Sequence, residues 1–138
     1  MRLLLVALPL LAGCLLDAEE HAERMLCREL RDALDDDTPA PVADANYLDE
    51  GPLILSGDAY LEYTPNPSGT KMFASTSRLR LQVIDEFGRY PDVELQEESA
   101  CDELAMRWTL DLEPRLYYLL IDEVEDEPFA MMAVTIED

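Results

Sequence analysis

Apolar residues follow a helical spacing near the N-terminus of the chain. Between residues 17 and 34 they recur every three or four positions, which places them on one side of a helix. The positions on this side are Ala22, Leu26, Leu30 and Ala33. The acidic stretch 17–20 is typical of a helix start, and three aspartates at 35–37, followed by prolines, predict its end. We therefore expect an amphipathic helix that packs on the rest of the protein.

After residue 46 the apolar positions alternate with polar ones over short runs, which is the period of a half-buried strand. The predicted strands are 53–55, 59–64, 79–84, 106–112, 116–121 and 129–136. Turn-forming residues separate them, and this arrangement is typical of a mainly β protein. We expect a single antiparallel β-sandwich domain (jelly-roll or immunoglobulin-like) over residues 47–138, with one N-terminal α-helix. Residues 35–46, rich in proline and aspartate, are predicted to be a linker.

The first eleven residues have the pattern of a secretory signal. Met1 and Arg2 precede an apolar run from Leu3 to Leu11, and small residues follow. A membrane-spanning helix needs roughly 20 apolar residues, and the acidic residues that begin at Asp17 end this run too early. The alternative is a buried N-terminal helix.

The end of this run, Leu11-Ala12-Gly13-Cys14, resembles the lipobox of bacterial lipoproteins at each position. The resemblance implies that residues 1–13 are a signal peptide that is removed, and that Cys14 becomes the lipidated N-terminus. Residues 14–34 would then be the lipidated start and the amphipathic helix. Acyl chains on Cys14 would hold the protein on a membrane, since each buried CH₂ contributes about 0.8 kcal/mol. Leu15, in place of an aspartate, favours the outer membrane as the location in the bacterial cell envelope.

With Cys14 set aside, two cysteines remain, Cys27 and Cys101. An even number in an oxidising compartment predicts a disulfide between them. The alternatives are two free thiols or pairing with another protein.

The balance of charge excludes some classes of partner. Ten Lys and Arg residues stand against 31 Asp and Glu, for a formal net charge of −21. A surface of this sign repels nucleic-acid phosphates and anionic lipid headgroups, so neither is expected to bind it electrostatically. An apolar content of 49% excludes a disordered acidic tail. A lysine-poor acidic surface, with Lys71 as the single lysine, is also typical of a saline environment.

Two segments are similar to elements of bacterial pre-peptidase C-terminal β-sandwiches. Residues 79–88 have an apolar strand followed by Asp-x-x-Gly, and residues 108–119 have a hairpin with a Tyr-Tyr strand. That family has Pro-Gly in the hairpin turn, whereas this chain has Pro114-Arg115. The turn must therefore differ from a glycine-dependent one. The resemblance implies a sandwich that binds, spaces or targets and performs no chemistry.

Few residues suggest catalysis or metal binding. A metal site would pair His21 with Glu20, Glu23 or Cys27, but Cys27 lies on another side of the helix. Glu20 and Glu23 alone could meet across one turn, so a solvated polar face is expected. The acidic clusters, at 35–37, 97–103 and 122–127, lack the spacing and glycine of an EF-hand loop. Their carboxylates raise the alternative of calcium binding. Paired carboxylates are also the groups used by glycosidases, but no cleft can be inferred.

An aromatic sugar-stacking surface is a further alternative. Trp108 and Tyr118 could form one, but Trp108 shares its strand face with apolar residues, so we expect it in the core. Tyr117 and Tyr118 should point to opposite faces of their strand, which leaves one of them exposed.

The sequence thus predicts a lipid-anchored protein of the cell envelope, a binding or accessory module that is not an enzyme and needs no cofactor. Its expected partners are the membrane, through Cys14, and an envelope protein or polysaccharide. The alternative function is that of a periplasmic protein binding a divalent cation such as calcium through its acidic loops.

Overall fold

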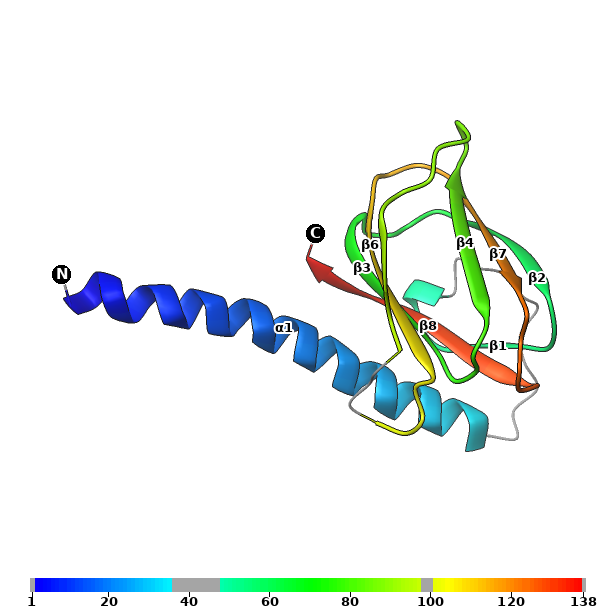
Figure 1. Cartoon of the computed structure of the whole chain (residues 1–138), viewed down its shortest axis with the longest axis horizontal. Coiled ribbons are helices and arrows are strands. Elements are labelled where there is room, and N and C mark those ends of the chain that lie inside the picture. The colour runs from blue at the N-terminus through cyan, green and yellow to red at the C-terminus, as the bar shows by residue number, and fades with distance from the viewer. Residues whose placement is uncertain (1, 36–47, 98–100, 138) are drawn as a thin grey trace.

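The computed structural model describes the backbone of residues 2–35, 48–97 and 101–137, and helix side chains from Ala18 to Leu34. The predicted linker 35–46 lies outside these residues except for Asp35. The described chain forms one helix, α1 (Arg2–Asp35), and eight strands (Figure 1). The strands are β1 (Leu53–Leu55), β2 (Ala59–Tyr63), β3 (Gly69–Ser75), β4 (Arg80–Asp85), β5 (Val93–Gln96), β6 (Met106–Leu112), β7 (Tyr117–Asp122) and β8 (Phe129–Glu137).

The strands form two antiparallel sheets, which confirms the predicted β-sandwich with an N-terminal helix. The larger sheet has the order β1-β8-β3-β6-β5, and the smaller has the order β2-β7-β4. A regular jelly roll divides eight strands between two sheets. Here β5 pairs with β6 in the larger sheet, so the smaller sheet ends at β4 after three strands.

The main core lies between the two sheets. Strand β6 shows how the alternating pattern builds it, because every second side chain from Met106 to Leu112 is buried and points inward. Trp108 is 2% exposed, which confirms its expected place in the core. Tyr117 is buried while Tyr118 is partly exposed on the other face, as their alternation predicts.

A second core lies between α1 and the outer face of the larger sheet. Ala22, Leu26 and Leu30 of the helix are buried there against β8 and β3. Glu23 forms an ion pair with Arg107 of β6 at 3.1 Å. The disulfide Cys27–Cys101 ties the helix to the loop before β6, with a Cα–Cα distance of 6.2 Å, and this confirms the predicted pairing. The last turns of the helix are thus fixed to the sheet, while its N-terminal end extends away from the sandwich (Figure 1).

The start of the helix differs from the prediction. We expected a cap at residues 17–20, but α1 begins at Arg2 and its helical backbone runs through Cys14 without a break. The run before the acidic stretch consists mainly of leucine and alanine. Both residues have a high helix propensity, so the helix begins before the acidic stretch. Asp35 is the last residue of the helix within the described residues, and the rest of the predicted stop at 35–37 lies outside them. In the described part of the chain, no helix has a stretch long and apolar enough to cross a membrane.

Two strands were not predicted. All side chains of β3 from Lys71 onward are buried, because α1 covers one face of this strand and the smaller sheet covers the other. Burial on both faces removes the alternation that reveals a strand. Strand β5 is short and mostly exposed, with Glu94 and Gln96 among its four residues, and therefore shows no apolar run.

Candidate binding site

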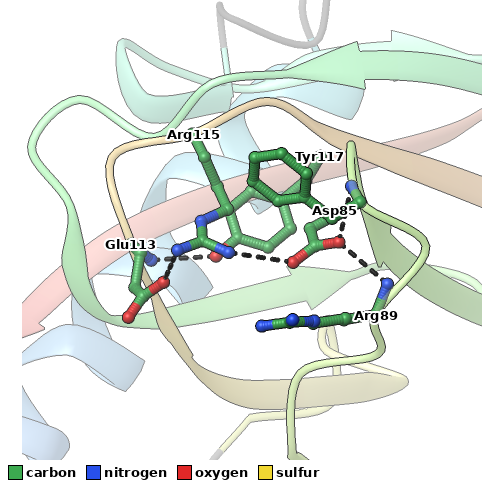
Figure 2. Close-up of polar contacts among 6 residues, drawn as sticks. Asp85, Arg89, Glu113, Arg115 and Tyr117 are labelled. Atoms are coloured by element: carbon green, nitrogen blue, oxygen red, sulfur yellow. Dashed lines mark hydrogen bonds and ion pairs between the residues drawn. The ribbon is translucent and has the colours of Figure 1, made fainter.

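A pocket of about 550 Å³ opens at the end of the sandwich where β4 ends. The loop after β4 forms one wall, with Arg89 and Tyr90, and the turn between β6 and β7 forms another, with Glu113 and Arg115. Figure 2 shows how the charged side chains of both segments meet around Asp85. The sequence predicted the turn after Asp85 but did not indicate that these segments meet.

Asp85 organises the loop that follows β4. Its Oδ1 atom accepts hydrogen bonds from the backbone N–H of Phe87 at 2.9 Å and of Arg89 at 2.8 Å (Figure 2). Gly88 donates its N–H to the backbone carbonyl of Asp85 and has φ +80°, a left-handed conformation that glycine adopts at little cost. The Asp-x-x-Gly sequence therefore encodes a tight turn held by the carboxylate.

Arg115 joins the two walls of the pocket. Its Nη1 atom lies 3.1 Å from Oδ2 of Asp85, and its Nη2 atom contacts the carboxylate of Glu113. The guanidinium also lies 5.3 Å from the ring centroid of Phe87, within the range of a cation–π interaction. The predicted departure from a glycine-dependent turn is confirmed, since Arg115 does not have positive φ. An arginine at this position instead ties the β6–β7 turn to the end of β4.

The hydrogen bonds determine the charge state of Asp85. Burial by itself raises the pKa of the carboxyl, but the backbone N–H groups of Arg89 and Phe87 and the guanidinium of Arg115 outweigh this effect. The net result is a pKa below the ordinary value for aspartate. For Arg115, burial lowers the pKa, but the interactions with Asp85 and Glu113 raise it by more. The net result is a raised pKa, so this side chain stays protonated.

We expect Asp85→Asn to lower the melting temperature at pH 7. An aspartate whose pKa is lower in the folded state stabilises the fold above its unfolded pKa, and this contribution disappears as the pH falls through the folded pKa. The difference between the variant and the wild type should therefore shrink as the pH is lowered below about 4. Thermal unfolding between pH 2 and pH 7 measures this difference, with the exposed neighbour substitution Glu86→Gln as the control. A difference that stays constant over this range would contradict the role of the Asp85 charge.

Most of the charged side chains in the pocket are engaged with one another. Asp85, Arg115 and Glu113 are engaged with one another, and the hydroxyl of Tyr117 accepts a hydrogen bond from the backbone N–H of Glu113 at 2.9 Å. Arg89 lies on the opposite wall, and its guanidinium has no ion-pair partner within the described residues. The guanidinium of Arg89 can donate hydrogen bonds to a bound molecule at this wall of the pocket.

A second polar group is buried near the start of β3. The ammonium of Lys71 lies 2.9 Å from Oδ1 of Asp49 and 2.8 Å from the hydroxyl of Thr135. Asp49 also accepts hydrogen bonds from the hydroxyl of Tyr63 at 2.7 Å and from the N–H of Asn66 at 3.0 Å. Burial, together with Asp49, raises the pKa of Tyr63, which therefore remains protonated. The single lysine is thus a core residue, 0% exposed, and contributes nothing to the surface.

The outer face of the smaller sheet carries an aromatic pair that the sequence did not identify. The rings of Tyr60 and Tyr118 stack with centroids 5.6 Å apart and an interplanar angle of 22°. Register places Tyr60 beside Leu120, and Glu62 beside Tyr118, on this face. Trp108 is in the core, so it forms no sugar-stacking surface with Tyr118.

The residues weighed as metal ligands do not come together. His21 is exposed on α1, where Glu20 pairs with Arg24 instead. In the acidic clusters Glu97, Glu103 and Asp122 form ion pairs with arginines, while Asp36, Asp37 and Glu98 lie outside the described residues. Within residues 2–35, 48–97 and 101–137, no group of three His, Cys, Asp or Glu side chains could hold a metal ion.

Comparisons with protein-family models, curated proteins and solved structures find no match to this chain.

Proposed function

We propose that this protein is a lipid-anchored component of the bacterial cell envelope that binds a partner outside the cytoplasm and catalyses no reaction. The residues Leu11-Ala12-Gly13-Cys14 carry the proposed anchor. The outer membrane is the proposed location, because Leu15 follows the cysteine.

The disulfide is the observation that carries this proposal. It pairs Cys27 with Cys101 and leaves Cys14 as the third cysteine, in the position that a lipoprotein modifies. Disulfides persist in oxidising compartments such as the periplasm and are rare in the cytosol. One cysteine pair and one lipobox cysteine together fit an exported lipoprotein.

The arrangement of α1 fits a binding role. The helix covers the outer face of the larger sheet, and its N-terminal end extends away from the sandwich (Figure 1). Anchoring through Cys14 would leave the pocket around Asp85 and the outer face of the smaller sheet available to a partner. Because Asp85, Arg115 and Glu113 engage one another, the proposal includes no chemical step.

We expect Cys14→Ala to abolish membrane attachment. The variant keeps the apolar segment but lacks the thiol to which a diacylglyceryl group would be joined. It should remain as an uncleaved precursor or leave the membrane fraction, and it should incorporate no radiolabelled fatty acid. Cell fractionation with immunoblotting and fatty-acid labelling measures both properties.

Leu15→Ala is the matched control, because it changes a neighbouring apolar residue and retains the thiol. It should be labelled and sediment with membranes like the wild type. Recovery of Cys14→Ala in washed membranes as processed mature protein would overturn the proposed anchor.

A further inference from the structure

Exposed apolar side chains are concentrated on one short segment of the chain. Of the six large hydrophobic residues that are exposed among the described residues, four lie between positions 87 and 95. Phe87 and Tyr90 are on the loop after β4, and are 67% and 70% exposed. Val93 and Leu95 are on β5, and are 41% and 47% exposed. Most of the large apolar side chains that are exposed in the described part of the chain thus lie on this segment, among charged residues.

Val93 and Leu95 point toward the interior side of the larger sheet. They pair in register with Leu110 and Trp108, which are buried between the two sheets. Directly paired residues of antiparallel strands have side chains on the same face. The smaller sheet ends at β4 after three strands, and this explains why the side chains of β5 are exposed although they face inward.

Within the described residues, no second strand pairs with β5, so it has a free edge. It is the last strand of the larger sheet and pairs on one side, with β6. Every second residue of an edge strand directs its N–H and C=O groups away from the neighbouring strand, where another strand can pair with them. The free edge and the exposed apolar side chains thus lie on the same four residues.

The other face of the segment is acidic. Glu94 pairs in register with Thr109 on the helix-bearing face of the larger sheet, and Asp92 precedes it by two residues. A shallow pocket of about 270 Å³ runs between them and Asp111. Among the described residues no arginine or lysine forms an ion pair with Asp92 or Glu94. A strand that pairs with β5 would therefore meet apolar side chains on one face and uncompensated carboxylates on the other.

We propose that β5 is a docking edge for an extended segment of a partner protein in which apolar residues alternate with arginine or lysine. The inference rests on the proposed binding function and specifies its partner. The added strand extends the larger sheet through backbone hydrogen bonds, as in β-strand addition. Its apolar side chains cover Val93 and Leu95, and its cationic side chains lie beside Asp92 and Glu94.

Charge distinguishes this partner from a second copy of the chain. Pairing of two β5 edges would bring Asp92 and Glu94 of both copies together, and like charges on adjacent strands destabilise the pair. Each copy also carries a net charge of −21, which opposes self-association. A strand with positively charged side chains is instead attracted by this negative charge.

The test uses the full chain in detergent micelles and a synthetic nine-residue peptide of alternating valine and arginine. A peptide of the same composition with its valines and arginines in two blocks, and one of alternating valine and glutamate, are the controls. We expect the alternating cationic peptide to bind at least tenfold more tightly than either control by fluorescence anisotropy. Hydrogen exchange should show new protection of the backbone amides of β5.

Variants of the edge separate its two contributions. The double variant Val93→Thr, Leu95→Thr keeps residues that favour a strand. It should weaken binding at least about tenfold, because it removes the two apolar side chains that the peptide would cover. Glu94→Lys should weaken binding of the cationic peptide and improve binding of the valine–glutamate peptide. Leu34→Gln changes a large apolar side chain on α1 that is 43% exposed, and is the matched control that should leave binding unchanged.

Equal binding of the alternating and blocked cationic peptides would overturn the proposal, since it indicates attraction by charge alone. Protection confined to β4, or dimerisation of the free chain through β5 in sedimentation equilibrium, would overturn it as well. None of these results would affect membrane attachment through Cys14, so the docking edge and the anchor can fail separately.

Discussion

Asp49→Ala should lower the free energy of unfolding by roughly 3–5 kcal/mol, because it leaves a buried positive charge without its counter-charge. The side chain of Lys71 is 1% exposed, and its ammonium lies 2.9 Å from Asp49. In the variant the ammonium retains the hydroxyl of Thr135 as a neutral acceptor. Tyr63 and the N–H of Asn66 would also lose an acceptor. Urea unfolding at neutral pH, monitored by circular dichroism, measures the loss.

Two further variants isolate the charge. Adding Lys71→Met to Asp49→Ala removes the unpaired ammonium and should recover a substantial part of the lost stability, because an apolar side chain of similar length can replace it. Asp122→Ala removes an ion pair with Arg80, in which the Arg80 side chain is 52% exposed and the Asp122 side chain 36%. It should therefore lower the free energy of unfolding by at most about 1 kcal/mol. An equal cost for Asp49→Ala and Asp122→Ala would contradict the buried-charge explanation.

Lys71 also shows where inference from the sequence reaches its limit. Its strand, β3, was not predicted, because α1 and the smaller sheet bury both of its faces and no alternation remains. Strand β6 is buried on one face and largely only partly buried on the other, so its side chains alternate and the pattern identified it correctly. A pattern in the sequence reports whether the two sides of a strand differ, and β3 has no such difference.

The pocket was predictable only in part, for a related reason. The turn after Asp85 depends on residues within four positions of one another, and the sequence indicated it. The ion pair from Arg115 to Asp85 joins residues 30 positions apart, and depends on how β4 and β7 pair in the smaller sheet. The turn at Pro114-Arg115 was visible in the sequence, but the role of Arg115 depends on this pairing.

The same distinction applies to the free edge of β5. The predicted antiparallel β-sandwich is correct, but the sequence did not show that β5 joins the larger sheet. That choice leaves β4 at the edge of a three-stranded sheet and exposes Val93 and Leu95. The proposed docking edge is therefore a consequence of how strands are distributed between sheets, which alternation along one strand cannot specify.

Removal of the disulfide should have the second large effect on stability. We expect the double variant Cys27→Ala, Cys101→Ala to lose roughly 2–4 kcal/mol of unfolding free energy, since the bond closes a long loop in the unfolded chain. The two cysteines are 74 positions apart. Alanine is preferable to serine here because Cys27 is buried against apolar residues of the larger sheet. Urea unfolding without reductant measures the difference.

The helix should also become less protected, although it will not detach fully. Leu26 and Leu30 remain buried against the larger sheet, and the ion pair of Glu23 with Arg107 is retained. Amides of α1 from Ala22 to Leu34 should therefore exchange faster in the double variant, while those of β7 should change less. Wild-type protein treated with reductant should reproduce this profile, and Cys14→Ala should not, because it keeps the bond. Two reactive thiols besides Cys14 in the native protein would show that the bond is not formed.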